Sequence, residues 1–302
     1  MPQPNGMACL VILKIILHHG NSLQTTETHG QLKINIRKHK KDFMKVSTMA
    51  EFMARGEQPE VLFWVGCAGS FDQRAQKITQ AFATILDKAG VNYAILGKEE
   101  ACTGDPARRA GNEFMFQMMA YQNIQILNGY EIKKIVTTCP HCFNTLKNEY
   151  PALGGVYDVI HHTTFLQELI EGGKIKFTDS NEWKGKSITY HDSCYLGRAN
   201  EIYEAPRKVL ESLDMELREM KRCKSKGLCC GAGGAQMFKE EEKGTIRINT
   251  ERANEAIETK ADFVASACPF CNTMMTDGIK NRDEDVATEV LDIAEIIAKA
   301  IQ

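Results

Sequence analysis

Short apolar runs alternate with amphipathic stretches along most of the chain. Residues 61–65 form a continuous apolar run that ends at Gly66-Cys67, a pattern typical of a buried strand. A helical period follows from about Gln73 to Lys88. The other elements predicted in this half are strands at 93–96, 135–137 and 156–160, a helix from Asp105-Pro106 to about Asn128, and a helix at 164–171. Alternation of this kind predicts an α/β fold with parallel strands.

The order of elements starts again after a polar segment. Gly172 and Gly173 end the last helix of the first half, and the polar segment that runs to Asn181 is the expected domain junction. Beyond it we predict strands at 187–191 and 264–266 and helices at 205–213, 245–260 and 291–301. The chain therefore divides into a first domain at 44–178 and a second at 179–302, each Rossmann-like, in a tandem pseudo-symmetric pair.

Residues 1–43 differ in character from the rest. The run 8–17 is apolar, but Lys14 interrupts it, and it is too short to span a bilayer. No small-residue cleavage site follows, which argues against a signal peptide. We expect this segment to be a disordered N-terminal extension or to precede the true start at Met44.

Composition and charge exclude some classes of protein. The chain has 302 residues, is 43% hydrophobic and carries a formal net charge of −2, so there is no electrostatic argument for binding nucleic acid or anionic lipid. With no export signal, the 11 cysteines indicate a reducing, cytoplasmic setting. Cys9 and Cys223 fall outside the patterns described next and are most simply free thiols.

Five cysteines in the second half form one motif. Cys194 is followed by the adjacent pair Cys229-Cys230 and by Cys268-Pro-Phe-Cys271. Clustered cysteines in a non-secreted chain more often bind metal than form disulfides. Five thiolates exceed the four ligands of a structural zinc ion, so this motif indicates iron and sulfide.

The first half carries the same motif with one change. Cys67, Cys102, Cys139 and Cys142 precede their counterparts by 127 or 129 residues, and Cys139-Pro-His-Cys142 matches the later Cys-Pro-Phe-Cys frame. This agreement indicates a tandem duplication. Thr103 stands where the second copy has Cys230. Four cysteines suit either a Cys₄ zinc site or a [4Fe–4S] cluster.

The pattern resembles the cysteine-rich "CCG" domain family, which includes the B-type and D-type components of heterodisulfide reductases and the iron–sulfur subunits of glycolate oxidase and lactate-utilisation enzymes. The resemblance covers residue 44 to the C-terminus. It implies that the second set, Cys194, Cys229, Cys230, Cys268 and Cys271, binds a [4Fe–4S]-type cluster, which is non-cubane in some members. Thr103 departs from the family pattern and leaves the first site open between iron–sulfur and zinc.

Other residues near the motifs suggest chemistry. His191-Asp192-Ser193-Cys194 through Arg198 resembles a family stretch with serine in place of proline, so His191 and Arg198 are candidates for a proton donor or a positive charge beside a cluster. The alternative is a structural role, in which His191 ends a strand and Arg198 pairs with a carboxylate. The stretch from Asp105 to Arg109 also resembles family sequence, so Arg108 and Arg109 are candidates to stabilise a reduced, anionic cluster or a substrate carboxylate. The alternative is a solvated helix face. His161 and His162 end a strand, with Thr163 as the expected helix cap.

Gly231, Gly233 and Gly234 follow the cysteine pair, where they would let backbone amides approach sulfur. The phosphate-loop alternative lacks the Lys-Ser/Thr ending.

The resemblance implies an iron–sulfur electron-transfer subunit of an oxidoreductase complex, similar to the B-type component of heterodisulfide reductase. No ferredoxin-type cysteine run occurs in the chain, so the expected partner is a ferredoxin-like iron–sulfur subunit or a flavoprotein, in a complex that docks on a membrane or stays free of it. A cluster that splits disulfides is the alternative within this class. A zinc-stabilised scaffold without redox activity is the alternative outside it.

Overall fold

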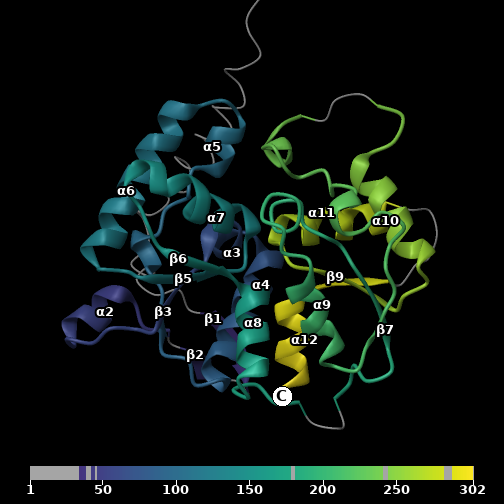
Figure 1. The fold of residues 1–302 in the computed structure, drawn as a ribbon, viewed down its shortest axis with the longest axis horizontal. Coiled ribbons are helices and arrows are strands. Elements are labelled where there is room, and N and C mark those ends of the chain that lie inside the picture. The colour runs from purple at the N-terminus through teal and green to yellow at the C-terminus, as the bar shows by residue number, and fades with distance from the viewer. Residues whose placement is uncertain are drawn as a thin grey trace, which may run out of the picture.

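The computed structural model describes residues 34–38, 42–44, 46–177, 181–240, 244–281 and 288–301. Its body consists of two four-stranded parallel sheets, one from each predicted domain (Figure 1). The first sheet has the order β4-β3-β5-β6, and the second has β8-β7-β9-β10 when followed in the same direction. The duplication predicted from the cysteine spacing is therefore a duplication of the whole strand order. The strands are β3 (Val61–Trp64), β4 (Tyr93–Ala94), β5 (Lys134–Thr137), β6 (Asp158–His161), β7 (Ser187–Tyr190), β8 (Glu216–Leu217), β9 (Phe263–Ser266) and β10 (Glu289–Asp292).

The strand register brings the carboxyl ends of neighbouring strands together at one edge of each sheet. In the first sheet Trp64 pairs with Thr137, and Thr137 in turn pairs with His161. In the second sheet Tyr190 pairs with Ala265, and Ser266 pairs with Asp292. Because the strands are parallel, the loops that leave these residues converge at the carboxyl edge of each sheet, where ligands gather in open α/β folds.

Helices surround both sheets. In the first half they are α2 (Met49–Ala54), α3 (Gly66–Phe71), α4 (Gln73–Lys88), α5 (Asp105–Arg109), α6 (Glu113–Gly129), α7 (Pro140–Asn144) and α8 (His162–Glu171). In the second half they are α9 (Glu204–Glu211), α10 (Ile248–Glu258), α11 (Pro269–Lys280) and α12 (Ile293–Ala300). Shorter turns are η3 (Gly97–Glu99), the π-helical η4 (Thr145–Glu149), η5 (Tyr150–Leu153), η6 (Lys224–Lys226) and η7 (Gln236–Phe238).

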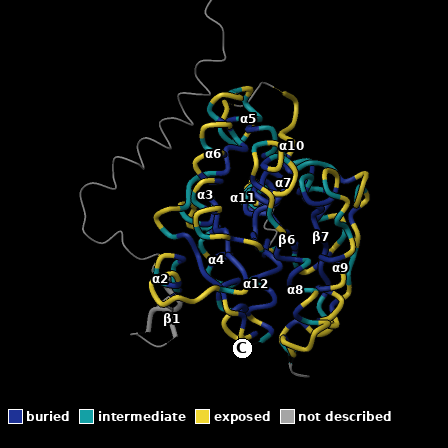
Figure 2. The backbone as a smooth tube through the Cα atoms, turned by 60° about the vertical axis from the view of Figure 1, so that its left-hand side comes forward, coloured by how far each residue is buried: buried dark blue, intermediate teal, exposed yellow. Residues whose placement is uncertain are grey.

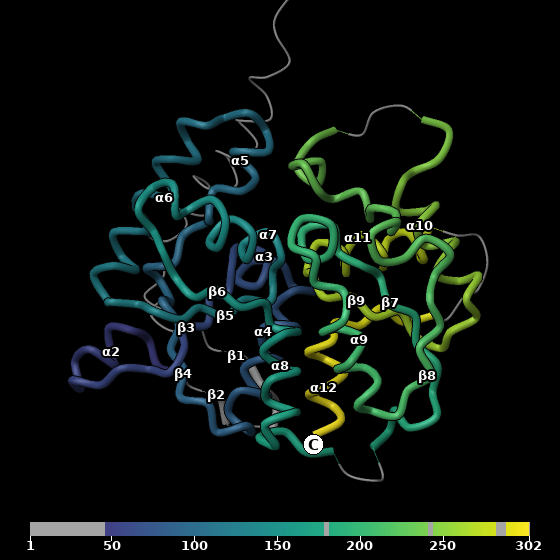
Figure 3. Tube along the Cα trace, viewed as in Figure 1, coloured from purple at the N-terminus to yellow at the C-terminus, as the bar shows by residue number. Residues whose placement is uncertain are grey.

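The two halves share one hydrophobic core. Helices α4 and α8 of the first half pack against α9 and α12 of the second, between the two sheets (Figure 3). Apolar side chains from both sheets join this core, including Phe63 and Ile188, so buried residues concentrate between the sheets (Figure 2). Arg74 of α4 bonds both carboxylate oxygens of Glu295 in α12, at 2.8 and 2.6 Å. The halves are thus held together by an interior rather than by a surface contact.

Each sheet buries its other face under helices of its own half. Leu62 and Trp64 of β3 pack with residues of α6, whereas Phe63 on the same strand faces the shared core. In the second half Val264 packs with residues of α10 and α11. This two-sided burial explains why the strands are continuous apolar runs in the sequence.

The structure corrects several predicted boundaries. The helix expected from Asp105 to Asn128 is two helices, α5 and α6, because Gly111 adopts a left-handed φ of +86° and Asn112 caps a new helix. The helix expected from Leu291 begins two residues later, since Leu291 belongs to β10. The predicted strand at 156–160 begins at Asp158, and the helix after it starts at His162.

Part of the predicted N-terminal extension contains secondary structure. Strands β1 (Ile34–Lys38) and β2 (Asp42–Met44) pair antiparallel. The rest of residues 1–43, including Cys9, lies outside the described residues. Within the part of the chain that the structure describes, no helix has the length and apolar character required to cross a membrane.

Candidate functional site

The five cysteines of the second set come from separate segments of one sheet edge. Cys194 lies in the loop after β7, and Cys229 and Cys230 lie between η6 and η7. Cys268 follows β9 and caps α11, and Cys271 sits in the first turn of that helix, where Pro269 occupies an early position. Cys230, Cys268 and Cys271 are buried, and the other two are half-buried.

The sulfurs of this set form one connected chain of contacts. Hydrogen bonds between thiols link Cys194 to Cys229, Cys229 to Cys230, and Cys268 to Cys271. The sulfurs of Cys230 and Cys271 are 3.3 Å apart, and this contact joins the two groups of thiols. None of the ten cysteines in the described residues forms a disulfide. The set predicted from the sequence therefore converges on a single place.

The pKa values of these thiols diverge. The pKa of Cys229 is lowered because the thiols of Cys194 and Cys230 hydrogen-bond to its sulfur. The pKa values of Cys194, Cys230 and Cys271 are raised, chiefly by hydrogen bonds to neighbouring sulfurs and by burial. The shifts diverge because one thiolate among these sulfurs repels a second negative charge nearby. A cationic core among the sulfurs would allow the others to ionise.

Backbone amides add donors to both sets at equivalent positions. The N–H of Gly231 donates to the sulfur of Cys229 at 3.3 Å, and the N–H of Gly104 donates to Cys102 at 3.5 Å. Gly231 has a φ of +92° and Gly104 a φ of +88°. Glycine adopts this left-handed conformation without a steric cost, so the chain can turn at each residue whose N–H donates to the cysteine two positions earlier.

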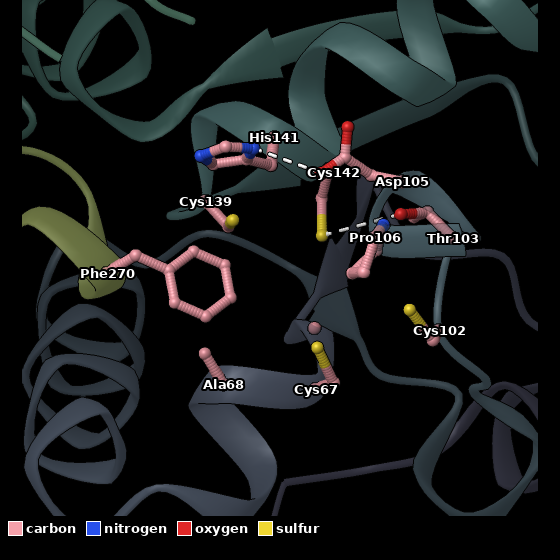
Figure 4. A pocket seen from close by; sticks show the side chains of 11 residues that line it. Cys67, Ala68, Cys102, Thr103, Asp105, Pro106, Cys139, His141, Cys142 and Phe270 are labelled. Atoms are coloured by element: carbon pink, nitrogen blue, oxygen red, sulfur yellow. Dashed lines mark hydrogen bonds and ion pairs between the residues drawn. The ribbon is translucent and has the colours of Figure 1, made fainter. Parts of the chain in front are cut away.

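The four cysteines of the first set line a pocket at the carboxyl edge of the first sheet (Figure 4). Cys67 lies at the start of α3, Cys102 in the loop after η3, and Cys139 caps α7, which contains Cys142. A hydrogen bond between Cys67 and Cys102 lowers the pKa of Cys67 and raises that of Cys102. The pKa of Cys142 is raised by its hydrogen bond to Cys139, by burial and by charge on the other cysteines. All four sulfurs therefore belong to one site.

One side chain from the second half completes this pocket. Phe270, the residue between Pro269 and Cys271, lines the first site and also packs beside Cys230, Cys268 and Cys271. Its counterpart in the first half, His141, packs against the rings of Tyr195 and Phe270, with ring centroids 4.2 and 5.4 Å apart. The rings of His141, Tyr195 and Phe270 thus pack together where the two sets of cysteines adjoin.

His141 is anchored by a charged network. Its Nδ1 lies 3.0 Å from Asp105, and Asp105 also accepts from Arg109. Arg108 and Arg109 both pair with Glu149. Burial alone would lower the pKa of His141, but its hydrogen bond to Asp105 and the nearby cysteine charges outweigh burial and raise it. The two arginines are therefore tied to carboxylates of the first domain.

His191 is fully buried beside the second set. One of its ring nitrogens lies within 4.8 Å of the sulfurs of Cys230 and Cys271. Its Nδ1 accepts a hydrogen bond from Arg252 Nε at 2.9 Å, whereas its Nε2 has no hydrogen-bond partner among the described residues. Burial and the charge of Arg252 lower the pKa of His191 to about 3, which keeps the ring neutral.

Arg198 lies near the same set but bonds to the backbone. It donates to the carbonyl of Gly227 at 2.6 Å, whereas the structural interpretation expected a carboxylate partner. Its charge opposes the rise in the pKa of Cys194, which the hydrogen bond to Cys229 and burial cause.

His161 and His162 lie between the two domains. Burial lowers the pKa of both rings, for His162 to about 3. His162 Nε2 is 3.1 Å from Asp292 of the second half, and His161 caps α8. The cap is thus His161, and the expected cap at Thr163 is wrong. Cys223 is half-buried, and burial raises its pKa, so it is not an activated thiol.

Some of the polar residues around the sites were not found by sequence reasoning. Arg252 lies on α10 with no motif near it, and Glu100 is a half-buried carboxyl that accepts from the amides of Val65 and Gly66. Burial raises the pKa of Glu100 to about 8. Only the variable position of the two Cys-Pro-x-Cys frames, His141 and Phe270, carried a signal in the sequence.

Taken together, the fold and the site define a duplicated α/β protein that gathers cysteines at the facing edges of its two sheets. The family model of the CCG cysteine-rich domain matches residues 61–147 and 188–276, and the chain belongs to this family. The matched ranges begin at β3 and within β7, so each contains one cysteine set.

Curated relatives extend the comparison. The chain is 43% identical over 258 residues to "Probable iron-sulfur-binding oxidoreductase FadF" of Bacillus subtilis, covering 85% of this chain and 36% of that protein. It is 43% identical over 253 residues to "EtfAB:quinone oxidoreductase" of Syntrophomonas wolfei, covering 82% of this chain and 35% of that protein. The D-type component of the dihydromethanophenazine:CoB–CoM heterodisulfide reductase of Methanosarcina barkeri is 35% identical over 254 residues, covering 81% of this chain and 60% of that protein.

The chain spans about a third of the length of the first two relatives. Among solved structures, a hypothetical protein from Helicobacter pylori superposes with a TM-score of 0.52 at 9% identity, covering 81% of this chain and 49% of that one. This likeness concerns the fold alone.

Proposed function

We propose that this chain is an iron–sulfur electron-transfer subunit, or domain, of an oxidoreductase. The observation that carries the proposal is the connected chain of five sulfurs, closed by the 3.3 Å contact between Cys230 and Cys271. Family membership and the names of the relatives, which include an iron–sulfur-binding oxidoreductase and a quinone oxidoreductase, support the same conclusion.

The second set fits a polynuclear cluster better than a single ion. A structural zinc ion takes four ligands, whereas five cysteines converge here without a disulfide. A [4Fe–4S]-type cluster held by these five cysteines would supply one-electron transfer. Around it the chain provides the amide donor of Gly231 and the positive charge of Arg198, both of which stabilise negative charge on sulfur.

The first set fits a four-coordinate centre. Cys67, Cys102, Cys139 and Cys142 surround one pocket, and the hydroxyl of Thr103 stands where a fifth sulfur would be. We propose a [4Fe–4S] cluster here, with a structural zinc ion as the competing occupant. The adjacency of the two sites through Phe270 favours the cluster, because a redox centre at this position would continue an electron path between sites.

The direction of electron flow depends on a partner. We propose a ferredoxin-like iron–sulfur or flavin-containing partner, supplied by a separate protein or by further chain as in the longer relatives. The boundaries proposed for the two domains, 44–178 and 179–302, place one centre in each. We also propose a cytoplasmic setting for both sites, because clustered thiols that bind metal need a reducing environment.

The test is metal analysis of anaerobically purified protein together with EPR of its reduced form. The proposal expects a brown protein with iron and acid-labile sulfide. Cys271→Ser should remove the second site's iron and EPR signal, and Cys142→Ser should act only on the first. Cys223→Ser is the matched control, because Cys223 lies outside both sets and should leave iron content unchanged.

Two outcomes would contradict parts of the proposal. Zinc without iron in the wild-type protein would contradict electron transfer and would indicate a zinc-stabilised structural scaffold. Zinc that is lost only in Cys142→Ser, with iron retained at the second site, would make the first site structural and leave a single redox centre.

A further inference from the structure

His191 carries a buried ring nitrogen that no residue in the described part of the chain satisfies. The side chain is fully buried at the end of β7, and its backbone N–H donates to the carbonyl of Ala265 at 2.9 Å, which pins it beside the strand leading to Cys268. Buried polar atoms are nearly always paired, so a lone one requires an explanation. One ring nitrogen of His191 lies within 4.8 Å of the sulfurs of Cys230 and Cys271.

Arg252 decides which nitrogen of His191 carries the proton. Arg252 Nε donates to Nδ1, so Nδ1 must present its lone pair. A neutral imidazole has one N–H, which is then on Nε2. Arg252 cannot exchange these roles, because a guanidinium is always a donor.

The orientation of Arg252 is itself fixed. It is fully buried and donates to the carbonyl of Arg222 at 2.7 Å and to Glu255 at 2.6 Å. The same Glu255 also binds the side chain of Arg222. The tautomer of His191 is therefore set by a network that extends from α10, away from the cysteines.

The hydrogen-bond pattern distinguishes a donor from a metal ligand. A metal-bound histidine ordinarily donates its other N–H to a carboxylate or a carbonyl. At His191 the other nitrogen accepts from a cation, which is the reverse arrangement, and metal ligation through Nε2 would need an imidazolate. We propose that His191 is a positioning residue that donates an Nε2–H···S hydrogen bond to the cluster held by the second set, with Arg252 selecting the required tautomer.

The first half offers a parallel. Trp64 occupies the position of His191, three residues before the first cysteine of its set, and it is also fully buried. Its indole Nε1, a donor only, lacks a hydrogen-bond partner among the described residues. Two different rings at equivalent positions thus each keep one buried nitrogen without a partner among the described residues.

This inference rests on the proposed function, and its consequence is electronic. An N–H donor to cluster sulfur stabilises the reduced state, which carries more negative charge, and so raises the reduction potential. Removal of the donor should shift the one-electron reduction equilibrium about tenfold toward the oxidised state, equivalent to about 59 mV.

The experiment uses the full chain, anaerobically reconstituted, in four forms: wild type, His191→Phe, His191→Gln and Thr189→Val. His191→Phe removes the donor, whereas His191→Gln keeps an amide N–H. Thr189→Val removes another buried polar atom, in the adjoining strand β7, that has no hydrogen-bond partner among the described residues, and it serves as the matched control. The readouts are iron content, an EPR-monitored redox titration, and ENDOR of the paramagnetic cluster after exchange into D₂O.

We expect an exchangeable deuteron coupled to the second cluster in the wild type. In His191→Phe this deuteron coupling should be lost and the reduction potential should fall. Both should be largely restored in His191→Gln and unaffected in Thr189→Val. The wild-type ENDOR measurement with ¹⁵N-labelled histidine tests the hydrogen bond directly, even if His191→Phe does not fold.

Three results would overturn the inference. Iron bound with no histidine-linked deuteron coupling, or with the same potential in His191→Phe, would show that the ring does not reach the cluster. A directly bonded histidine nitrogen would make His191 a ligand. Absence of iron from the wild type would instead defeat the proposed function, and this inference with it.

Discussion

The hydroxyl of Thr103 lies 4.0 Å from the sulfur of Cys142, in the position where the second half brings Cys230 to within 3.3 Å of Cys271. The duplication has therefore kept the geometry of a fifth ligand in the first half while replacing its sulfur by oxygen. At this position the two sites differ by a threonine hydroxyl in place of a cysteine thiol.

This relationship predicts that Thr103→Cys creates a five-cysteine site in the first half. The buried new thiol would meet Cys142 as Cys230 meets Cys271. We expect the EPR signal and the iron content of the first site to approach those of the second after anaerobic reconstitution. Thr79→Cys, a buried threonine on α4 that does not line the pocket, is the control. Identical spectra for Thr103→Cys and the wild type would show that the frame cannot use a fifth sulfur.

Gly231 should resist substitution more than its neighbour Gly233. Gly231→Ala forces a side chain into a φ of +92°, which costs about 1–2 kcal/mol, and disturbs the amide that donates to Cys229. We expect a lower free energy of unfolding in denaturant and a more negative potential at the second site. A Cβ on Gly233 meets no atom within 4 Å, so Gly233→Ala should change stability by less than about 0.5 kcal/mol. Equal effects at both positions would contradict this account.

A buried ion pair supports the loop that carries Cys194. Arg207 is 3% exposed and bonds both oxygens of Asp192 at 2.9 Å, and Asp192 also accepts the N–H of Lys224. Arg207→Met leaves a buried carboxylate unpaired, so the free energy of unfolding should fall by about 3–5 kcal/mol.

The control for this ion pair is Arg218→Met, which breaks the exposed pair with Glu216. Its effect on the free energy of unfolding should be much smaller than that of Arg207→Met, because solvent screens an exposed pair. Adding Asp192→Asn to Arg207→Met should recover part of the loss, because the uncompensated charge is then gone. A double variant no more stable than Arg207→Met would show that the charge is not what destabilises the single variant.

His162 and Asp292 predict opposite pH dependences across the domain interface. Burial raises the pKa of Asp292 to about 7 and lowers that of His162 to about 3. Between the unfolded value of 3.8 and about 7, folded Asp292 keeps a proton that the unfolded chain releases, so its contribution to stability falls as pH rises. Between about 3 and 6.5, the unfolded chain protonates His162 and the folded protein does not, so that contribution rises with pH.

In the wild type these two contributions largely cancel between about pH 4 and 6.5. In His162→Gln the stability should fall with rising pH over this range, and in Asp292→Asn it should rise. Each slope approaches about 1.4 kcal/mol per pH unit relative to the wild type. Denaturant unfolding at several pH values measures the difference, and parallel profiles for the three proteins would contradict it.

Much of the fold followed from local sequence patterns. The run 61–65 became β3, the helical period at 73–88 became α4 with the expected bounds, and the strand before each Cys-Pro-x-Cys frame was confirmed. These elements are set by neighbours in the sequence, either through continuous burial or through an amphipathic period. The single helix expected across Gly111 was wrong because a short break divides it. Strand β10 was missed because its four residues adjoin the apolar segment of the next helix.

By itself, the sequence determined that the protein is a duplication with two sets of cysteines, one of them lacking a member, because spacing and residue type are properties of the chain. The tertiary structure alone decided that Phe270 would line the first site and that Arg252 would fix the tautomer of His191. Both contacts join residues brought together by sheet order and helix packing across long stretches of chain. Short-range patterns fix which residues are available, and the orientation of a ring or a donor depends on packing that no local pattern encodes.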